Sequence, residues 1–138
     1  MPSRRALVDS SAYFALTDPR DIRHGYSLQA RERLINERWN VLTTNFLLAE
    51  THALLLTRLG RDTAARVLRE IDRSATTVIR ITRDDELRAR QIIDEYVDKD
   101  FSLVDATSFA VMERLSVSFA FAFDRHFVQF GFQLLNPL

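Results

Sequence analysis

The chain has 138 residues, 46% of them hydrophobic, and its 19 basic and 19 acidic residues give a formal net charge of zero. This length and composition predict a single domain, 1–138, with one real core, and the balanced charge excludes a strong overall attraction to nucleic acid. The absence of cysteine excludes disulfides, zinc–thiolate sites and thiol catalysis. No apolar run approaches the roughly 20 residues of a membrane span, and the first apolar stretch is too short for a signal peptide, so we expect a soluble cytoplasmic protein with no membrane contact.

Short apolar runs alternate with longer amphipathic stretches, which predicts an α/β domain with a parallel sheet. In chain order we expect a strand over 5–8, helices over 10–16 and 23–37, a strand over 40–43, helices over 45–59 and 62–74, a strand over 77–81, helices over 84–96 and 103–115, a strand over 119–123, a helical turn over 125–130 and an edge strand over 132–135. Asn45 is expected to cap one helix, and Asp62 or Arg61 to cap the next.

Four acidic residues interrupt or end apolar segments. Asp9 and Asp124 follow two expected strands, Glu50 lies in the apolar stripe of a helix, and Asp105 opens a mostly apolar helix. A carboxylate on an apolar face is costly unless something compensates its charge. In open α/β sheets, ligands bind beyond the carboxyl ends of the strands, so these acids could converge there around a divalent cation such as Mg²⁺ or Mn²⁺.

Each of these acids also has a purely structural interpretation. Asp9 and Asp124 are suitable helix caps, and the segment from Ser102 to Asp105 matches the capping-box pattern. Glu50 could lie at the edge of its stripe and pair with an arginine. Capping and metal binding are compatible, however, because a carboxylate in the first turn of a helix can do both.

Other polar residues near these acids leave alternatives open. Asp98 and Asp100 flank the single lysine, Lys99, in a polar loop that is either simply solvated or supplies accessory acids at the rim of the site. His126 could approach a phosphate beside Asp124. The preference for arginine over lysine suits bidentate phosphate contacts, but a codon bias would explain it equally well.

Several other classes of site are disfavoured by what the sequence lacks. It has no glycine-rich dinucleotide or phosphate loop, no His-Glu-x-x-His and no Gly-x-Ser-x-Gly elbow. A phosphoacceptor receiver domain would show an early acidic pair and a lysine after its last strands. Here Asp9 stands alone at the first strand end and Lys99 precedes a helix. The complete set of acids also argues against a binding module that has kept the fold and lost catalysis.

Four segments of the chain resemble, in the same order, the acidic motifs of PIN-domain proteins. They are Leu7–Ser11, Asn45–Glu50, Asp100–Ala106 and Phe123–Phe127. The last two segments resemble in particular the VapC-type toxins of toxin–antitoxin pairs. This resemblance implies a three-layer α/β/α fold whose parallel sheet has the strand order 3-2-1-4-5.

The resemblance also implies a Mg²⁺- or Mn²⁺-dependent endoribonuclease that hydrolyses RNA. The catalytic and metal-site roles then belong to Asp9, Glu50, Asp105 and Asp124, directly or through water, and Ser11 would hydrogen-bond within the cluster. The implied partners are the RNA substrate, a VapB-like antitoxin and a second copy of the chain in a homodimer. An RNA-processing or DNA nuclease outside a toxin pair, or a silent PIN-like binding module, remains the alternative. From the residues themselves, Phe127 and Phe130 are candidates for partner contacts.

Overall fold

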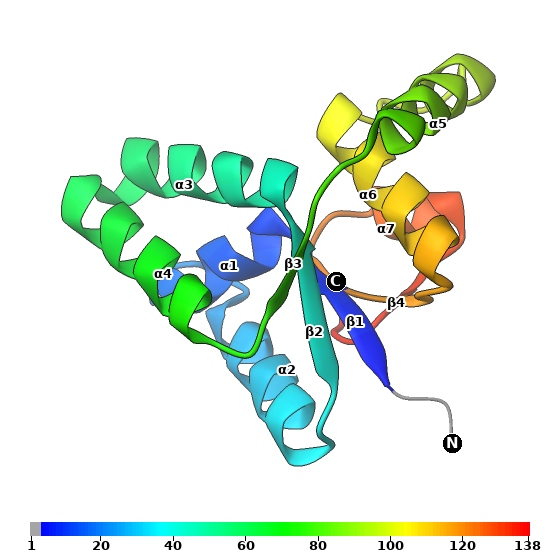
Figure 1. The fold of residues 1–138 in the computed structure, drawn as a ribbon. Coiled ribbons are helices and arrows are strands. Elements are labelled where there is room, and N and C mark those ends of the chain that lie inside the picture. Colours follow the sequence, from blue (N-terminus) through cyan, green and yellow to red (C-terminus); the bar gives the residue numbers. More distant parts are fainter. Residues whose placement is uncertain (1–3) are drawn as a thin grey trace.

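The computed structural model describes residues 4–138 and contains a parallel five-stranded sheet with the order β3-β2-β1-β4-β5. Residues 1–3, part of the basic N-terminal stretch, lie outside the described residues. Helices α1, α2 and α4 cover one face of the sheet, and α5, α6 and α7 cover the other (Figure 1). Both the strand order and the three-layer architecture confirm the expectation from the sequence.

The elements alternate along the chain much as the apolar pattern predicts. Strands and helices follow in the order β1 (Arg5–Val8), α1 (Ser10–Thr17), α2 (His24–Asn36), β2 (Asn40–Thr44), α3 (Asn45–Leu59), α4 (Arg61–Arg73), β3 (Thr77–Ile79), α5 (Arg83–Glu95), α6 (Leu103–Leu115), β4 (Phe119–Phe121), α7 (His126–Phe130) and β5 (Gln133–Leu134). The last three strands are shorter than expected, and the sheet edge at β5 is only two residues long. No helix within residues 4–138 is long and apolar enough to cross a membrane.

Strands β1 and β4 form the centre of the sheet and are buried on both faces. In β1, Ala6 and Val8 belong to the core beneath α1, α2 and α4, whereas Leu7 belongs to the core beneath α5, α6 and α7. In β4, Phe121 belongs to the core beneath α1, α2 and α4, and Ala120 belongs to the core beneath α5, α6 and α7. Successive side chains of a strand point to opposite faces, so a continuous apolar run is what a central parallel strand requires.

Two predicted helix caps are wrong. The hydroxyl oxygen of Thr44, not the side chain of Asn45, caps α3 by accepting a hydrogen bond from the backbone N–H of Leu47 at 3.0 Å. The amide oxygen of Asn45 instead accepts from the backbone N–H of Ile81 at 2.9 Å, which ties the end of β3 to α3. Because the Thr44 hydroxyl already caps α3, the side chain of Asn45 is available for this contact with Ile81.

The following helix, α4, has no side-chain cap, so neither Asp62 nor Arg61 plays the expected role. Gly60 occupies the cap position with a φ of 92°, a backbone conformation that glycine adopts without the steric cost of a side chain. The turn from α3 into α4 therefore depends on the backbone freedom of this glycine rather than on a polar side chain.

An aromatic cluster fills the core between α6, α7 and β5. Phe109 stacks on Phe130 with ring centroids 4.7 Å apart and meets the edge of Phe127 at 5.2 Å. Phe127 is fully buried and Phe130 is partly buried against the same core. The prediction that Phe127 contacts a partner is therefore wrong, because an apolar ring at this position serves the core.

Candidate active site

Strands β1 and β4 bring Asp9 and Asp124 to the same edge of the sheet. Val8, the last residue of β1, pairs with Phe121, the last residue of β4, and the backbone N–H of Asp9 continues this ladder with a 3.0 Å hydrogen bond to the Phe121 carbonyl. Asp9 and Asp124 then extend beyond the carboxyl ends of the neighbouring strands. The strand order reverses around β1, which is where open α/β sheets bind ligands.

Asp9 is buried and held in one orientation by its neighbour Ser11. The Asp9 carboxylate accepts hydrogen bonds from the Ser11 backbone N–H at 3.1 Å and from the Ser11 hydroxyl at 2.5 Å, so Asp9 is also the cap of α1. The same hydroxyl oxygen accepts from the backbone N–H of Phe123 at 2.9 Å. Ser11 thus connects the segment after β1 to the segment after β4, and the structural interpretation of Asp9 as a helix cap is confirmed.

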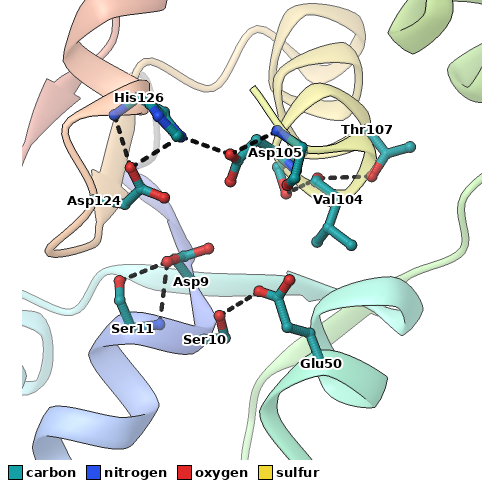
Figure 2. Close-up of polar contacts among 11 residues, drawn as sticks. Asp9, Ser10, Ser11, Glu50, Val104, Asp105, Thr107, Asp124 and His126 are labelled. Carbon is teal, nitrogen blue, oxygen red and sulfur yellow. Dashed lines mark hydrogen bonds and ion pairs between the residues drawn. The ribbon is translucent and has the colours of Figure 1, made fainter. Parts of the chain in front are cut away.

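Asp105 and Glu50 reach the same space from two helices. Asp105 forms the expected capping box of α6, accepting from the Ser102 backbone N–H at 3.1 Å and donating its own N–H to the Ser102 hydroxyl at 3.0 Å. Glu50 projects from the middle of α3, half-buried, and accepts a hydrogen bond from the Ser10 hydroxyl. Figure 2 shows these two carboxylates and those of Asp9 and Asp124 facing a common space.

His126 lies between two of the acids. Its Nδ1 is 2.7 Å from an oxygen of Asp105 and 3.2 Å from an oxygen of Asp124, and its ring meets the edge of Phe101 with centroids 5.3 Å apart. A carboxylate only accepts, so Nδ1 carries the hydrogen. One potential ligand atom from each of Asp105, Asp124 and His126 lies within 4.8 Å of the others. With its hydrogen on Nδ1, His126 orients the two carboxylates, and these carboxylates are the groups that could hold a cation.

Burial and repulsion from neighbouring acids make Asp9 and Glu50 harder to ionise. Burial raises the pKa of Asp9 to about 7, with further increases from the charges of Glu50 and Asp105 and an opposing effect of the Ser11 hydrogen bonds. Burial likewise raises the pKa of Glu50, and the charges of Asp105 and Asp124 add to this rise against the Ser10 hydrogen bond. The neighbouring charges that raise these two pKa values all belong to the other acids of the cluster, as expected for carboxylates that line one anionic pocket.

Comparison with known proteins identifies the fold family. The profile of the PIN domain matches residues 6–133. The chain belongs to the PIN-domain family. It is 34% identical over 131 residues to the 23S rRNA-specific endonuclease VapC20 of Mycobacterium tuberculosis, in an alignment that covers 95% of this chain and 98% of VapC20.

Three solved structures share this fold. The crystal structure of M. tuberculosis VapC20, described as a sarcin–ricin loop cleaving toxin, superposes with a TM-score of 0.85 at 33% identity, covering 96% of this chain and 99% of VapC20. FitAcB from Neisseria gonorrhoeae shares the fold with a TM-score of 0.72 at 15% identity, covering 96% of this chain and 97% of its own. A toxin–antitoxin complex from Klebsiella pneumoniae shares it with a TM-score of 0.61 at 17% identity and 87% coverage of each chain.

The structure of this PIN domain separates the acidic cluster from the two further acids considered in the sequence. Asp98 is exposed and pairs with Lys99 at 2.9 Å, and Asp100 is exposed as well. Within residues 4–138, no hydrogen bond or ion pair joins either residue to the cluster. An accessory role for Asp98 or Asp100 stays a prediction.

Two polar contacts of the PIN site were not anticipated. The sequence suggested only that His126 could approach a phosphate, and it gave no role to Ser10, which donates to Glu50. The sequence did place both residues close to acids of the cluster, since Ser10 directly follows Asp9 and His126 comes two residues after Asp124. Both side chains act on an acid of a different segment, so their partners depend on the tertiary fold.

Proposed function

We propose that the protein is a metal-dependent endoribonuclease that hydrolyses RNA phosphodiester bonds, and that it is the VapC-type toxin of a toxin–antitoxin pair. The observation that carries this proposal is the convergence of four carboxylates on one space at the carboxyl edge of the sheet. Its support from related proteins is the 34% identity to a 23S rRNA-specific endonuclease over nearly the whole chain.

The donor set fits Mg²⁺ or Mn²⁺. Both ions prefer oxygen ligands. Burial, and to a smaller extent repulsion from Glu50 and Asp105, raises the pKa of Asp9, and a cation among the acids would offset both effects. Asp9, Asp105 and Asp124 would hold the ion, with Glu50 reaching it directly or through water. When bound, such an ion makes a water molecule more acidic and neutralises charge that develops on the phosphate.

The side chains of the chain itself supply orientation and proton transfer. Ser11 fixes the Asp9 carboxylate, and His126 fixes those of Asp105 and Asp124, so that these groups need little reorganisation when substrate binds. Glu50 is the acid best suited to accept a proton from the attacking water. The other three acids would hold the ion directly, whereas Glu50 could reach it through water, and the hydrogen bond that Glu50 accepts from Ser10 orients its carboxylate in the pocket.

The substrate class follows from the relative. VapC20 is named for cleavage of 23S rRNA and of the sarcin–ricin loop, so that loop is the first RNA to test with this protein. A VapB-like antitoxin is the expected protein partner, and a homodimer is the expected assembly. An RNA substrate and such a partner would place the protein in the cytoplasm.

A cleavage assay with a matched pair of variants tests the proposal. Purified protein is incubated with a sarcin–ricin-loop hairpin and with total RNA, in Mg²⁺, in Mn²⁺ and in a chelator, and the fragment ends are mapped. We expect metal-dependent cleavage that Asp105→Asn lowers at least about 100-fold. Equal activity in the chelator, a preference for DNA, or undiminished cleavage by Asp105→Asn would contradict the proposal.

The control for this variant is Asp85→Asn. Asp85 occupies the same position in the capping box of α5 as Asp105 does in that of α6, accepting from the Thr82 backbone N–H at 3.0 Å. Asp85 pairs with Arg114, outside the acidic cluster. A loss of activity that came only from a weakened helix cap would appear in both variants, whereas we expect it in Asp105→Asn alone.

A further inference from the structure

A cleft lies beside the acidic cluster, with Ser11 in its lining. It has a volume of about 260 Å³ and is formed by α1, the segment before α2, α3 and the segment after β4. Its lining consists of Ser11, Phe14, Asp21, Arg23, Leu54, Arg58 and Phe123. Two arginines next to two phenylalanines give this cleft a cationic and aromatic character that the acidic cluster lacks.

Ser11 is common to the cleft and the acidic cluster. Its hydroxyl donates to Asp9 at 2.5 Å and accepts from the backbone N–H of Phe123 at 2.9 Å, and Phe123 directly precedes Asp124. A group bound in the cleft would therefore lie immediately next to the carboxylates. The two features form one continuous surface, with negative charge on one side of Ser11 and positive charge on the other.

Both arginines are held by aromatic rings and not by acids. The guanidinium of Arg23 lies 5.7 Å from the centre of the Phe123 ring, and that of Arg58 lies 5.9 Å from the centre of the Phe14 ring. Contact of this kind orients a guanidinium while leaving its N–H groups free to donate. Within residues 4–138, neither guanidinium has an ion pair, although Arg33, Arg66, Arg88 and Arg114 each have at least one.

Asp21 is the one acid in the lining, and its carboxylate is already engaged. It accepts a 2.8 Å hydrogen bond from the backbone N–H of Arg23 and so shapes the turn that presents this arginine. Two positive side chains therefore face one negative side chain in the cleft. The local balance favours an anion that can accept several hydrogen bonds, as the oxygens of a phosphate do.

The net charge of the protein explains why a local site of this kind is needed. A chain with zero net charge does not attract RNA as a whole, and four clustered carboxylates repel the phosphate that must approach them. Arginines placed beside the acids offset this repulsion at the point where the backbone of the substrate passes. They also fix the position of the scissile bond, because orientation of the reacting groups contributes strongly to rate.

We infer that this cleft binds a backbone phosphate of RNA next to the scissile one, with Arg23 and Arg58 as positioning residues. This inference rests on the proposed ribonuclease activity and adds the subsite that holds the substrate. The contacts are made to phosphate and not to bases, so the cleft contributes to affinity and to register on the RNA, whereas recognition of sequence lies elsewhere.

Binding is measured first, in an Asp105→Asn background that does not cleave. Fluorescence anisotropy with a labelled sarcin–ricin-loop hairpin gives the Kd over a range of salt concentrations for Arg23→Gln, Arg58→Gln and the double variant. We expect the double variant to bind at least about tenfold more weakly, with a log Kd–log salt slope reduced by about 1 for each phosphate that the variant no longer neutralises. Unchanged affinity and slope would overturn the inference.

Two further variants control for charge and for position. Arg69→Gln removes an exposed arginine of α4 that lines neither site, so it should leave the affinity and slope unchanged. Arg58→Lys keeps the charge and loses the bidentate fork, so it should restore only part of the affinity. An equal loss in Arg69→Gln would show that general charge, and not the cleft, determines binding.

Cleavage kinetics of the same substitutions in the active protein distinguish this inference from the proposed function. We expect KM to rise at least about tenfold because the arginines hold the backbone phosphate, and kcat to fall by a smaller factor because the scissile bond is less well oriented. If native protein cleaves RNA and the arginine variants match it, the subsite is wrong and the ribonuclease stands. If native protein cleaves no RNA, the proposed function itself fails. Loss of binding to an acidic peptide, with RNA binding unchanged, would assign the cleft to a protein partner and overturn the inference.

Discussion

Asp9→Asn should stabilise the metal-free protein at alkaline pH. The pKa of Asp9 rises from 3.8 to about 7 on folding, because the carboxylate is buried beside Glu50 and Asp105. The difference of about 3 units corresponds to roughly 4 kcal/mol of folding free energy that the ionised carboxylate costs. Asparagine is neutral, is nearly isosteric and is as good a helix cap as aspartate, so the substitution removes this cost without removing the cap.

The pH dependence of this effect has a defined sign. The folded pKa of Asp9 lies above the unfolded one, so between about pH 4 and pH 7 the folded state binds more protons than the unfolded state. The stability of the native protein therefore falls as pH rises through this window. The advantage of Asp9→Asn should grow by roughly 3 kcal/mol between about pH 5 and pH 8. The raised pKa of Glu50 acts in the same direction but is present in both proteins.

Urea denaturation in a chelator measures the difference directly. The single tryptophan, Trp39, reports unfolding by fluorescence, and Asp72→Asn, an exposed substitution on α4, serves as the control. Mg²⁺ should reverse the order of stability, because it binds the native site more tightly than the Asp9→Asn site and stabilises by mass action. An advantage that stays constant with pH, or a variant less stable than native protein at about pH 8, would refute the reasoning.

Three further substitutions test other contacts. His126→Ala removes the ring that bridges two carboxylates and should lower Mg²⁺ affinity, measured by calorimetry, and cleavage by roughly tenfold. Burial alone would raise the pKa of Asp85, yet hydrogen bonds from Arg114 hold that pKa below its usual value. Arg114→Leu should therefore lower the free energy of unfolding, measured by urea titration at neutral pH, by about 1–2 kcal/mol. That cost should disappear as pH falls through the lowered pKa of Asp85. Ser116, with a φ of 56°, ends α6 in a left-handed conformation, so Ser116→Gly should raise thermal stability by up to about 1 kcal/mol.

The local sequence was sufficient to predict most of the fold. The apolar runs that become β1 and β4 are continuous because central parallel strands are buried on both faces. Such a run can be recognised in the sequence without knowing which strands lie beside it. The capping box at Ser102 and Asp105 was equally recognisable, because its two hydrogen bonds join residues three positions apart. The caps of α3 and α4 were not, since Thr44, Asn45 and Gly60 have roles that depend on tertiary contacts or on backbone conformation.

The sequence by itself determined which residues carry charge at the strand ends and at the start of α6, because strand and helix periodicity are properties of short segments. The pairing of β1 with β4 was expected from the family resemblance and not from any local pattern, and the tertiary structure shows that it brings Asp9 and Asp124 to one space. Only the tertiary structure decided which hydroxyl reaches Glu50, which acids His126 bridges, and which rings hold Arg23 and Arg58. These contacts join segments far apart in the chain, and their geometry is set by packing across two cores that no local pattern encodes.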